Sequence, residues 1–163
     1  QKVIVIKPKI DTKGDDYIVS RIGAKRKVDE LISESDSIIS KCSKYFDELD
    51  CIIVDEAQFL NQGQVDELWY VTKIYDIPVI AFGLRTDFRA NLFEGSSRLL
   101  ALADDIQEMP TICRCGSKAR FNARIINGKY TTHGDSIVID DKQDVKYESV
   151  CGACYVKKVL NKK

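Results

Sequence analysis

The chain has 163 residues, of which 44% are hydrophobic, a size that suits one domain or one domain with a small appendage. Lysine plus arginine and aspartate plus glutamate number 25 each, so no net charge attracts nucleic acid or an anionic membrane. No apolar run approaches the roughly 20 residues of a membrane span, and residues 1–6 are too short for a signal peptide. We therefore expect a soluble, cytoplasmic protein in which any anion site is local.

The first forty residues predict one strand, one loop and one helix. Residues 2–6 form a short apolar run rich in isoleucine and valine, which Pro8 ends because proline cannot continue a central ladder. Residues 11–21 are polar and predict a mobile loop. Its Arg21 can face a phosphate, although an ordinary surface arginine is the commoner case. Residues 26–40 repeat apolar side chains at weak helical spacing and predict a helix.

Cys51-Ile52-Ile53-Val54 predicts a strand buried on both faces, and Asp55 and Glu56 follow it at once. Ligands of open parallel sheets lie beyond the carboxyl ends of the strands, and successive side chains point to opposite faces. One acid can therefore face a metal ion while the other faces a substrate hydroxyl, as on the Walker B strand of a phosphate-transferring enzyme. The dipeptide alone leaves two solvated acids at a turn equally open.

The next segments continue an alternating order of strands and helices. Asn61 can cap a helix that runs to about residue 76, residues 77–82 predict a third strand, and residues 96–104 predict a short helix. This order predicts a parallel α/β sheet with right-handed crossovers. The buried stripe expected for the first helix is Val65, Leu68, Trp69, Thr72 and Tyr75. The loop at 83–95 indicates a site because it concentrates charged and aromatic residues: Arg85, Asp87, Phe88, Arg89 and Phe93.

Four of the six cysteines form two close pairs in the last third of the chain. The pairs enclose a segment rich in β signals, including a predicted hairpin with a type I′ turn at Asn127-Gly128 and a short strand at 137–139. In a reducing compartment such pairs favour a metal over disulfides, and four thiolates leave zinc no open position. The sequence therefore predicts a structural zinc ribbon, with four reduced buried thiols as the less favoured alternative. The ligands expected are Cys113, Cys115, Cys151 and Cys154.

Three features together closely resemble thymidine kinases of the cytosolic, zinc-containing type, and look most like a bacterial member. They are Val54-Asp55-Glu56-Ala57-Gln58-Phe59, then Gly83-Leu84-Arg85-Thr86-Asp87-Phe88-Arg89 with Phe93, and the cysteine pairs around a long loop. The resemblance runs from Val3 to Lys157. It implies an α/β fold with a parallel sheet flanked by helices, P-loop NTPase-like, over residues 1–110, and a small zinc-ribbon and lasso domain over residues 111–163.

The resemblance also implies an activity and the residues that carry it. The family transfers the γ-phosphoryl group of ATP to the 5′-hydroxyl of thymidine or deoxyuridine in nucleotide salvage. Asp55 matches the acid that holds Mg²⁺, Glu56 matches the general base, and Phe59 matches the aromatic that stacks on thymine. Arg89 follows Phe88 in the same loop, and we expect it to help near the phosphates. The other positions that match nucleoside-binding residues are Leu84, Phe88, Phe93, Val138, Ile139 and Tyr147.

Further expectations follow from the same resemblance. It implies a homotetramer with dTTP as feedback inhibitor, with neither nucleic acid nor membrane as partner. The lasso departs from the family pattern, because Asp140-Asp141 replace a glycine pair, which changes the register expected after Ile139. The family's P-loop, Gly-x-x-x-x-Gly-Lys-Ser/Thr, occurs nowhere in these 163 residues. We expect that the natural N-terminus is missing, that a strand is lacking beside Val54, and that this polypeptide alone is nearly inactive.

Two other interpretations stay open at this stage. One is a non-enzymatic zinc-ribbon module that binds nucleic acid through local positive charge. The other is a fragment of a P-loop ATPase or helicase. The nucleic-acid module does not explain the balanced net charge or the Asp55-Glu56 pair. The ATPase or helicase fragment does not explain the lasso. The local positive charge comes from Lys118, Arg120, Arg124 and Lys129.

Overall fold

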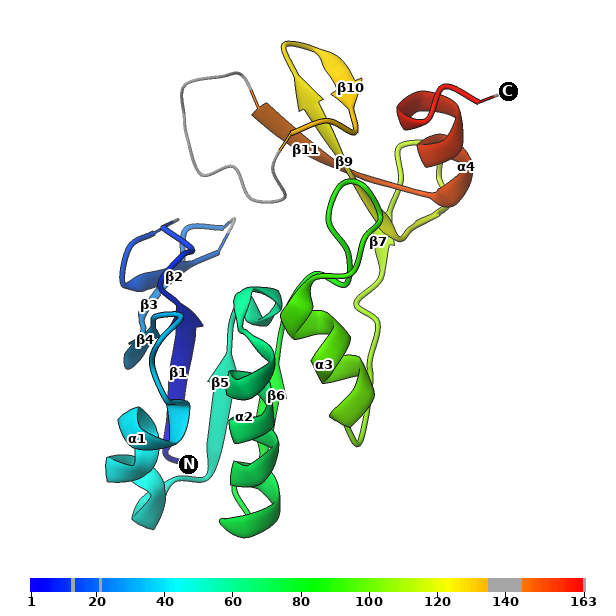
Figure 1. The fold of residues 1–163 in the computed structure, drawn as a ribbon. Helices are drawn as coiled ribbons and strands as arrows, with labels where there is room; N and C mark the ends of the chain where they lie inside the picture. Colours follow the sequence, from blue (N-terminus) through cyan, green and yellow to red (C-terminus); the bar gives the residue numbers. More distant parts are fainter. Residues whose placement is uncertain (13, 21, 135–144, 163) are drawn as a thin grey trace. The chain divides into compact units, whose positions relative to one another are not determined.

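The computed structural model describes residues 1–12, 14–20, 22–134 and 145–162 (Figure 1). The chain forms two compact units, the first made of Gln1–Arg85 and Phe93–Asp104 and the second of Thr86–Leu92 and Asp105–Lys163. The loop segment Thr86–Leu92 thus packs with the C-terminal residues. The division at residue 110 that we expect from the sequence stays a prediction.

A four-stranded sheet organises the first unit, in the order β4-β1-β5-β6, with every neighbouring pair parallel. The strands are β1 (Val3–Pro8), β4 (Glu30–Ile32), β5 (Cys51–Val54) and β6 (Val79–Ala81). This confirms the parallel α/β architecture. Because β5 pairs with β1 on one side and with β6 on the other, the expectation of a strand missing beside Val54 is wrong. The strand β1 also continues through Pro8, where the neighbouring Lys9 N–H donates to the Ile32 carbonyl.

Two segments before β5 differ from their predicted structures. The stretch expected to be a loop contains β2 (Tyr17–Val19), which pairs in antiparallel fashion with β3 (Lys25–Lys27). The helix expected at 26–40 is wrong, because the range contains the strands β3 and β4 and becomes helical only at α1 (Ile38–Cys42). The strand β4 pairs with β1, and its Ile32 packs in the core. The weak helical spacing of the apolar residues in the sequence could not reveal this pairing.

The helices of the first unit follow their local signals closely. Asn61 caps α2 (Gln62–Ile74) in a capping box with Gln64, which confirms the predicted start. Of the predicted buried stripe of α2, Val65 and Leu68 are buried, Trp69 and Thr72 are half-buried and Tyr75 is exposed, while Val71 is buried although it was not predicted. The remaining helical segments are the 3₁₀ turns η1 (Ser43–Glu48) and η2 (Ala57–Phe59) and the helix α3 (Glu94–Leu102).

The second unit is built on a three-stranded antiparallel sheet in the order β10-β9-β11. Asn127 and Gly128 have φ of 49° and 77° at the tip between β9 and β10, as the predicted type I′ turn requires. The predicted strand at 137–139 and Arg21 lie outside the described residues. The elements are β7 (Thr111–Ile112), β8 (Lys118–Ala119), β9 (Phe121–Ile126), β10 (Lys129–Thr131), β11 (Val145–Val150), α4 (Gly152–Cys154) and the π-helical turn η3 (Tyr155–Val159). Within the described ranges, no helix combines the length and apolar character that crossing a membrane requires.

Candidate functional site

The chain turns sharply where β5 ends. The Asp55 N–H donates to the Ile6 carbonyl at 3.0 Å, so Asp55 still belongs to the edge of the sheet. Glu56 has φ 48° and ψ 38°, a left-handed conformation that a non-glycine residue adopts at a cost in free energy. Glu56 in this conformation precedes η2 as its N-cap.

Gln58 fixes the Glu56 carboxylate. The Gln58 Nε2 donates to Glu56 Oε2 at 2.6 Å, and the Gln58 Oε1 accepts from the Leu84 N–H at 3.1 Å. The residue Gln58 is 2% exposed, so its amide group is itself shielded from water. Gln58 was not among the predicted site residues, because its only signal in the sequence is its place two residues after Glu56.

Two glycines allow the η2 turn to pack closely against other segments of the first unit. A Cβ atom at Gly83 would lie 2.7 Å from Gln58 Oε1, and one at Gly95 would lie 2.6 Å from the carbonyl oxygens of both Ala57 and Leu60. A side chain at either position would therefore displace the turn that carries Gln58. Ordinary Cβ contacts are well beyond 3 Å, so glycine is required here for space.

Two of the aromatic residues predicted to bind nucleoside meet in the first unit. The rings of Phe59 and Phe93 pack edge to face, with centroids 5.6 Å apart and an interplanar angle of 82°. Both side chains are half-buried, and Leu84 is 45% exposed. The Leu84 main chain is held on both sides, because its N–H donates to Gln58 and its carbonyl accepts from the Ser96 hydroxyl at 2.6 Å. These side chains present a partly exposed apolar surface that a planar base can contact.

A small cavity of about 60 Å³ adjoins the two acids. Asp11 also borders this cavity, and Lys7, which is 1% exposed, forms an ion pair with Asp11 at 3.1 Å. The cavity is lined by Asp11, Tyr17, Ile18, Val19, Asp55 and Glu56. Carboxylate oxygens are the ligands that Mg²⁺ prefers, so the donor set at this cavity fits that ion.

In the second unit, Arg124 contacts both Phe88 and Tyr147, the two described residues of this unit that were predicted to bind nucleoside. Its guanidinium carbon lies 3.6 Å from the centroid of the Phe88 ring, and its Nε donates to the Tyr147 hydroxyl at 3.1 Å. Arg124 and Phe88 are each 1% exposed, whereas Tyr147 is 52% exposed. The burial of Arg124 removes it from the positive surface that the nucleic-acid interpretation requires. Nothing in the sequence indicates that Arg124 is buried while the nearby arginines are exposed.

The loop that carries Phe88 is shaped by Asp87. Its Oδ1 accepts from the backbone N–H groups of Arg89 and Asn91, both at 2.9 Å, and its Oδ2 accepts from Arg89 Nε at 3.0 Å. The Arg89 guanidinium, which we expect to help near the phosphates, therefore forms an ion pair with Asp87. Ala90 has φ 66°, which closes the turn.

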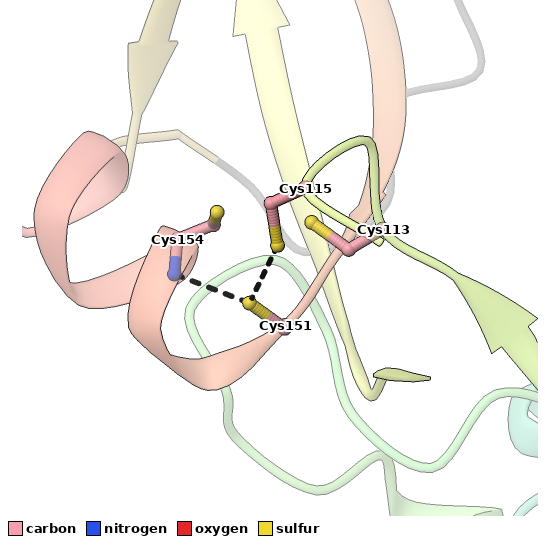
Figure 2. Close-up of side chains that lie close together, drawn as sticks. All are labelled: Cys113, Cys115, Cys151 and Cys154. Carbon is pink, nitrogen blue, oxygen red and sulfur yellow. Dashed lines mark hydrogen bonds between the residues drawn. The ribbon is translucent and has the colours of Figure 1, made fainter. Parts of the chain in front are cut away.

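The four paired cysteines converge, as Figure 2 shows, with all four Sγ atoms within 4.8 Å of one another. The Sγ atoms of Cys115 and Cys151 are 3.6 Å apart, and the Cys154 N–H donates to Cys151 Sγ at 3.4 Å. A tetrahedral zinc with Zn–S bonds of about 2.3 Å separates its sulfur ligands by about 3.8 Å. The donor set and its spacing therefore fit zinc.

The ionisation of these thiols also favours a cation among them. The backbone N–H of Ser117 lowers the pKa of Cys115 to about 6, and the backbone N–H of Cys115 lowers the pKa of Cys113. Hydrogen bonding with Cys115 and the other two clustered thiols raises the pKa of Cys154 to about 12. Neighbouring thiolates repel one another, so all four ionise together only when a positive ion offsets their charge.

The remaining predicted nucleoside residues, Val138 and Ile139, lie outside the described residues, as do Asp140 and Asp141. The site residues that the structure describes fall into two groups. Asp55, Glu56, Phe59, Leu84 and Phe93 belong to the first unit. Phe88, Tyr147 and the four cysteines belong to the second.

Comparison with known proteins gives one consistent result. Residues 1–155 match the family model described as thymidine kinase. The chain is 41% identical over 152 residues to the thymidine kinase of Enterobacteria phage T4, a match that covers 91% of this chain and 77% of the phage protein. It is 39% identical over 158 residues to the thymidine kinase of Francisella tularensis strain SCHU S4, covering 93% and 80%, respectively. The thymidine kinase of Shewanella oneidensis is 41% identical over 144 residues, covering 86% and 73%.

Proposed function

Because the chain belongs to the thymidine kinase family, we propose that it transfers the γ-phosphoryl group of ATP to the 5′-hydroxyl of thymidine or deoxyuridine. The observation that carries the proposal is the Asp55-Glu56 turn within the matched region, with the Glu56 carboxylate held by buried Gln58. Nothing in the comparisons favours the non-enzymatic alternative.

The two acids take separate roles in this proposal. Glu56 is the general base that accepts the proton of the 5′-hydroxyl, a role that requires a carboxylate of fixed direction within hydrogen-bond reach of the substrate. Asp55 holds Mg²⁺, and the carboxylates around the cavity support this assignment. The bound ion would neutralise charge on the phosphates, which is the main requirement of phosphoryl transfer.

The nucleoside is held mainly by aromatic and apolar residues. We propose that Phe59 stacks on the thymine ring, braced by its edge-to-face contact with Phe93. Backbone hydrogen bonds to the base edge then distinguish thymine from other bases, because an unpaired polar group in a closed site is costly. The other residues assigned to nucleoside binding are Leu84, Phe88, Phe93, Val138, Ile139 and Tyr147.

Several wider properties belong to the same proposal. The four clustered cysteines hold a structural zinc ion, as their spacing supports. Feedback inhibition by dTTP, a homotetrameric state and a cytoplasmic location rest on family resemblance and stay predictions. Arg89 forms an ion pair with Asp87. A role of Arg89 near the phosphates is likewise a prediction.

Phosphorylation of thymidine by the purified full-length protein, compared with its Glu56→Gln variant, tests the proposal. We expect the substitution to lower turnover by roughly 10²–10⁴-fold, the usual contribution of a general base, while thymidine binding measured by calorimetry persists. Glu34→Gln, at an exposed glutamate, is the matched control and should keep full turnover. Undiminished turnover in Glu56→Gln would reject the assignment. Binding of an oligonucleotide with strong salt dependence, without any binding of thymidine, would favour the non-enzymatic alternative.

A further inference from the structure

Tyr155 links the four-cysteine cluster to the loop that carries Phe88. Its hydroxyl donates to the Phe88 carbonyl at 2.7 Å, across 67 residues of sequence, and the Tyr155 side chain is 4% exposed. A buried carbonyl that loses such a donor has no water to replace it. This hydrogen bond therefore fixes the main chain of the loop at Phe88.

The position of Tyr155 depends on the cysteines. Tyr155 directly follows Cys154, and its N–H donates to the Cys151 carbonyl at 2.9 Å. Its ring stacks on Phe121, with centroids 5.0 Å apart and an interplanar angle of 27°. A change in the order of α4 therefore moves the Tyr155 hydroxyl.

Phe88 is held at two points within the second unit. Tyr155 binds its carbonyl, and the Arg124 guanidinium covers its ring. A loop that is ordered before its ligand arrives loses less conformational entropy on binding, and so binds more tightly. When the competent state of a loop becomes a smaller fraction of the population, the apparent affinity falls by that fraction.

We propose that Tyr155 is a positioning residue through which the order of the four-cysteine cluster sets the affinity for thymidine. The proposal rests on the assignment of Phe88 to nucleoside binding. Metal held by the cysteines orders α4, α4 orders Tyr155, and the Tyr155 hydroxyl keeps the loop in the conformation that binds. Tyr155 itself does not touch the substrate in this scheme.

The decisive variant is Tyr155→Phe, which removes one oxygen atom and keeps the stacked ring. We expect the Kd for thymidine, measured by calorimetry, to rise about tenfold, in line with the loss of one buried hydrogen bond. Amide hydrogen exchange over residues 86–92 should become faster, whereas exchange in β9 and the zinc content should not change. In kinetics, KM for thymidine should rise much more than kcat falls.

Tyr130→Phe is the matched control, because it removes a hydroxyl that donates to Glu148 at 2.9 Å in the same unit. It should leave both the thymidine Kd and exchange over residues 86–92 unchanged. Equal effects of the two substitutions would overturn the proposal, since they would indicate a general loosening of the ribbon. An unchanged Kd in Tyr155→Phe would overturn it as well.

Removal of zinc with a chelator provides a second test that also decides the matter if the variant folds poorly. Chelation should speed exchange over residues 86–92 and weaken thymidine binding in the wild type, and added Zn²⁺ should restore both. The affinity lost on chelation should be smaller in Tyr155→Phe, because the link is already broken. A wild type that holds zinc but never binds thymidine would overturn the proposed function together with this inference. Thymidine binding that is indifferent to zinc would overturn the inference alone.

Discussion

The Gln58 side chain donates to Glu56 Oε2 at 2.6 Å from a position that is 2% exposed. Its other polar atom accepts from the Leu84 N–H, so one buried amide connects the carboxylate to the segment after β6. Glu56 has a left-handed backbone, and such strained residues persist only where their surroundings hold them in place. Gln58 is therefore the group that sets the direction of the Glu56 carboxylate.

Gln58→Leu should lower kcat at least tenfold while leaving the Kd for thymidine within about twofold, because the base loses its orientation and the nucleoside contacts remain. It should also lower the free energy of unfolding by roughly 1–3 kcal/mol, because both hydrogen bonds of the buried Gln58 side chain are lost. Steady-state kinetics and urea unfolding measure the two effects. Gln62→Leu, at an exposed position of α2, is the control. A kcat equal to that of the wild type would show that Glu56 needs no support from Gln58.

Gly83→Ala should act on the same carboxylate from the other side. The new Cβ would lie 2.7 Å from Gln58 Oε1, so the Gln58 side chain must move and kcat should fall as in Gln58→Leu. Gly63→Ala is the control, because its Cβ meets only Asn61 Oδ1 at 3.5 Å within helix α2. Alanine there should raise the free energy of unfolding by about 0.5–1 kcal/mol with no change in kcat. If Gly83→Ala retains full turnover, the packing of this turn does not matter for the reaction.

Loss of zinc should unfold the second unit before the first. Among the described residues, two of the six in the second unit's buried core are the proposed zinc ligands Cys113 and Cys151, whereas fourteen form the core of the first. A metal that binds only the folded state stabilises it, so Cys151→Ser should lose bound zinc and amide protection in β9 and β11. Protection in β1 and β5 should persist.

Cys51→Ser provides the control for this experiment, because Cys51 lies outside the cluster. Metal analysis and hydrogen exchange on both variants give the comparison. A Cys151→Ser protein with one equivalent of zinc and an undisturbed β9 would contradict the structural role.

Asp36 gives a prediction about pH. Its carboxylate pairs with Lys41 at 2.7 Å and accepts from the Ser33 N–H at 2.7 Å, and these contacts, Lys41 first, hold the pKa of Asp36 well below its usual range. A lowered folded-state pKa adds stability above the unfolded value of about 3.9, and that stability disappears as the pH falls through the folded pKa. Asp36→Asn should therefore lower the urea midpoint at pH 7, and the gap from the wild type should narrow below about pH 3. Asp47→Asn, at an exposed aspartate, should show no such gap at any pH.

Several structural features could be predicted from residues that are close together in the sequence. Strand β5, the Asn61 cap, the Asn127-Gly128 turn and the cysteine pairs were all correctly predicted, because each depends on residues that are close in sequence. The place of Asp55 and Glu56 at the end of this buried strand was also predicted, because it depends on adjacent residues, whereas their roles stay predictions.

Long-range contacts decided what the linear pattern could not. Leu31 and Ile32 have the apolar character of a helix face, yet they belong to β4 because β1 offers a free parallel edge. In the sequence, Gln58 and Arg124 look like ordinary polar residues. In the fold, Gln58 accepts a hydrogen bond from Leu84, 26 residues away, and Arg124 donates one to Tyr147, 23 residues away. Both Gln58 and Arg124 are buried. A buried polar group is costly unless its partners are in place, and only the folded chain supplies those partners.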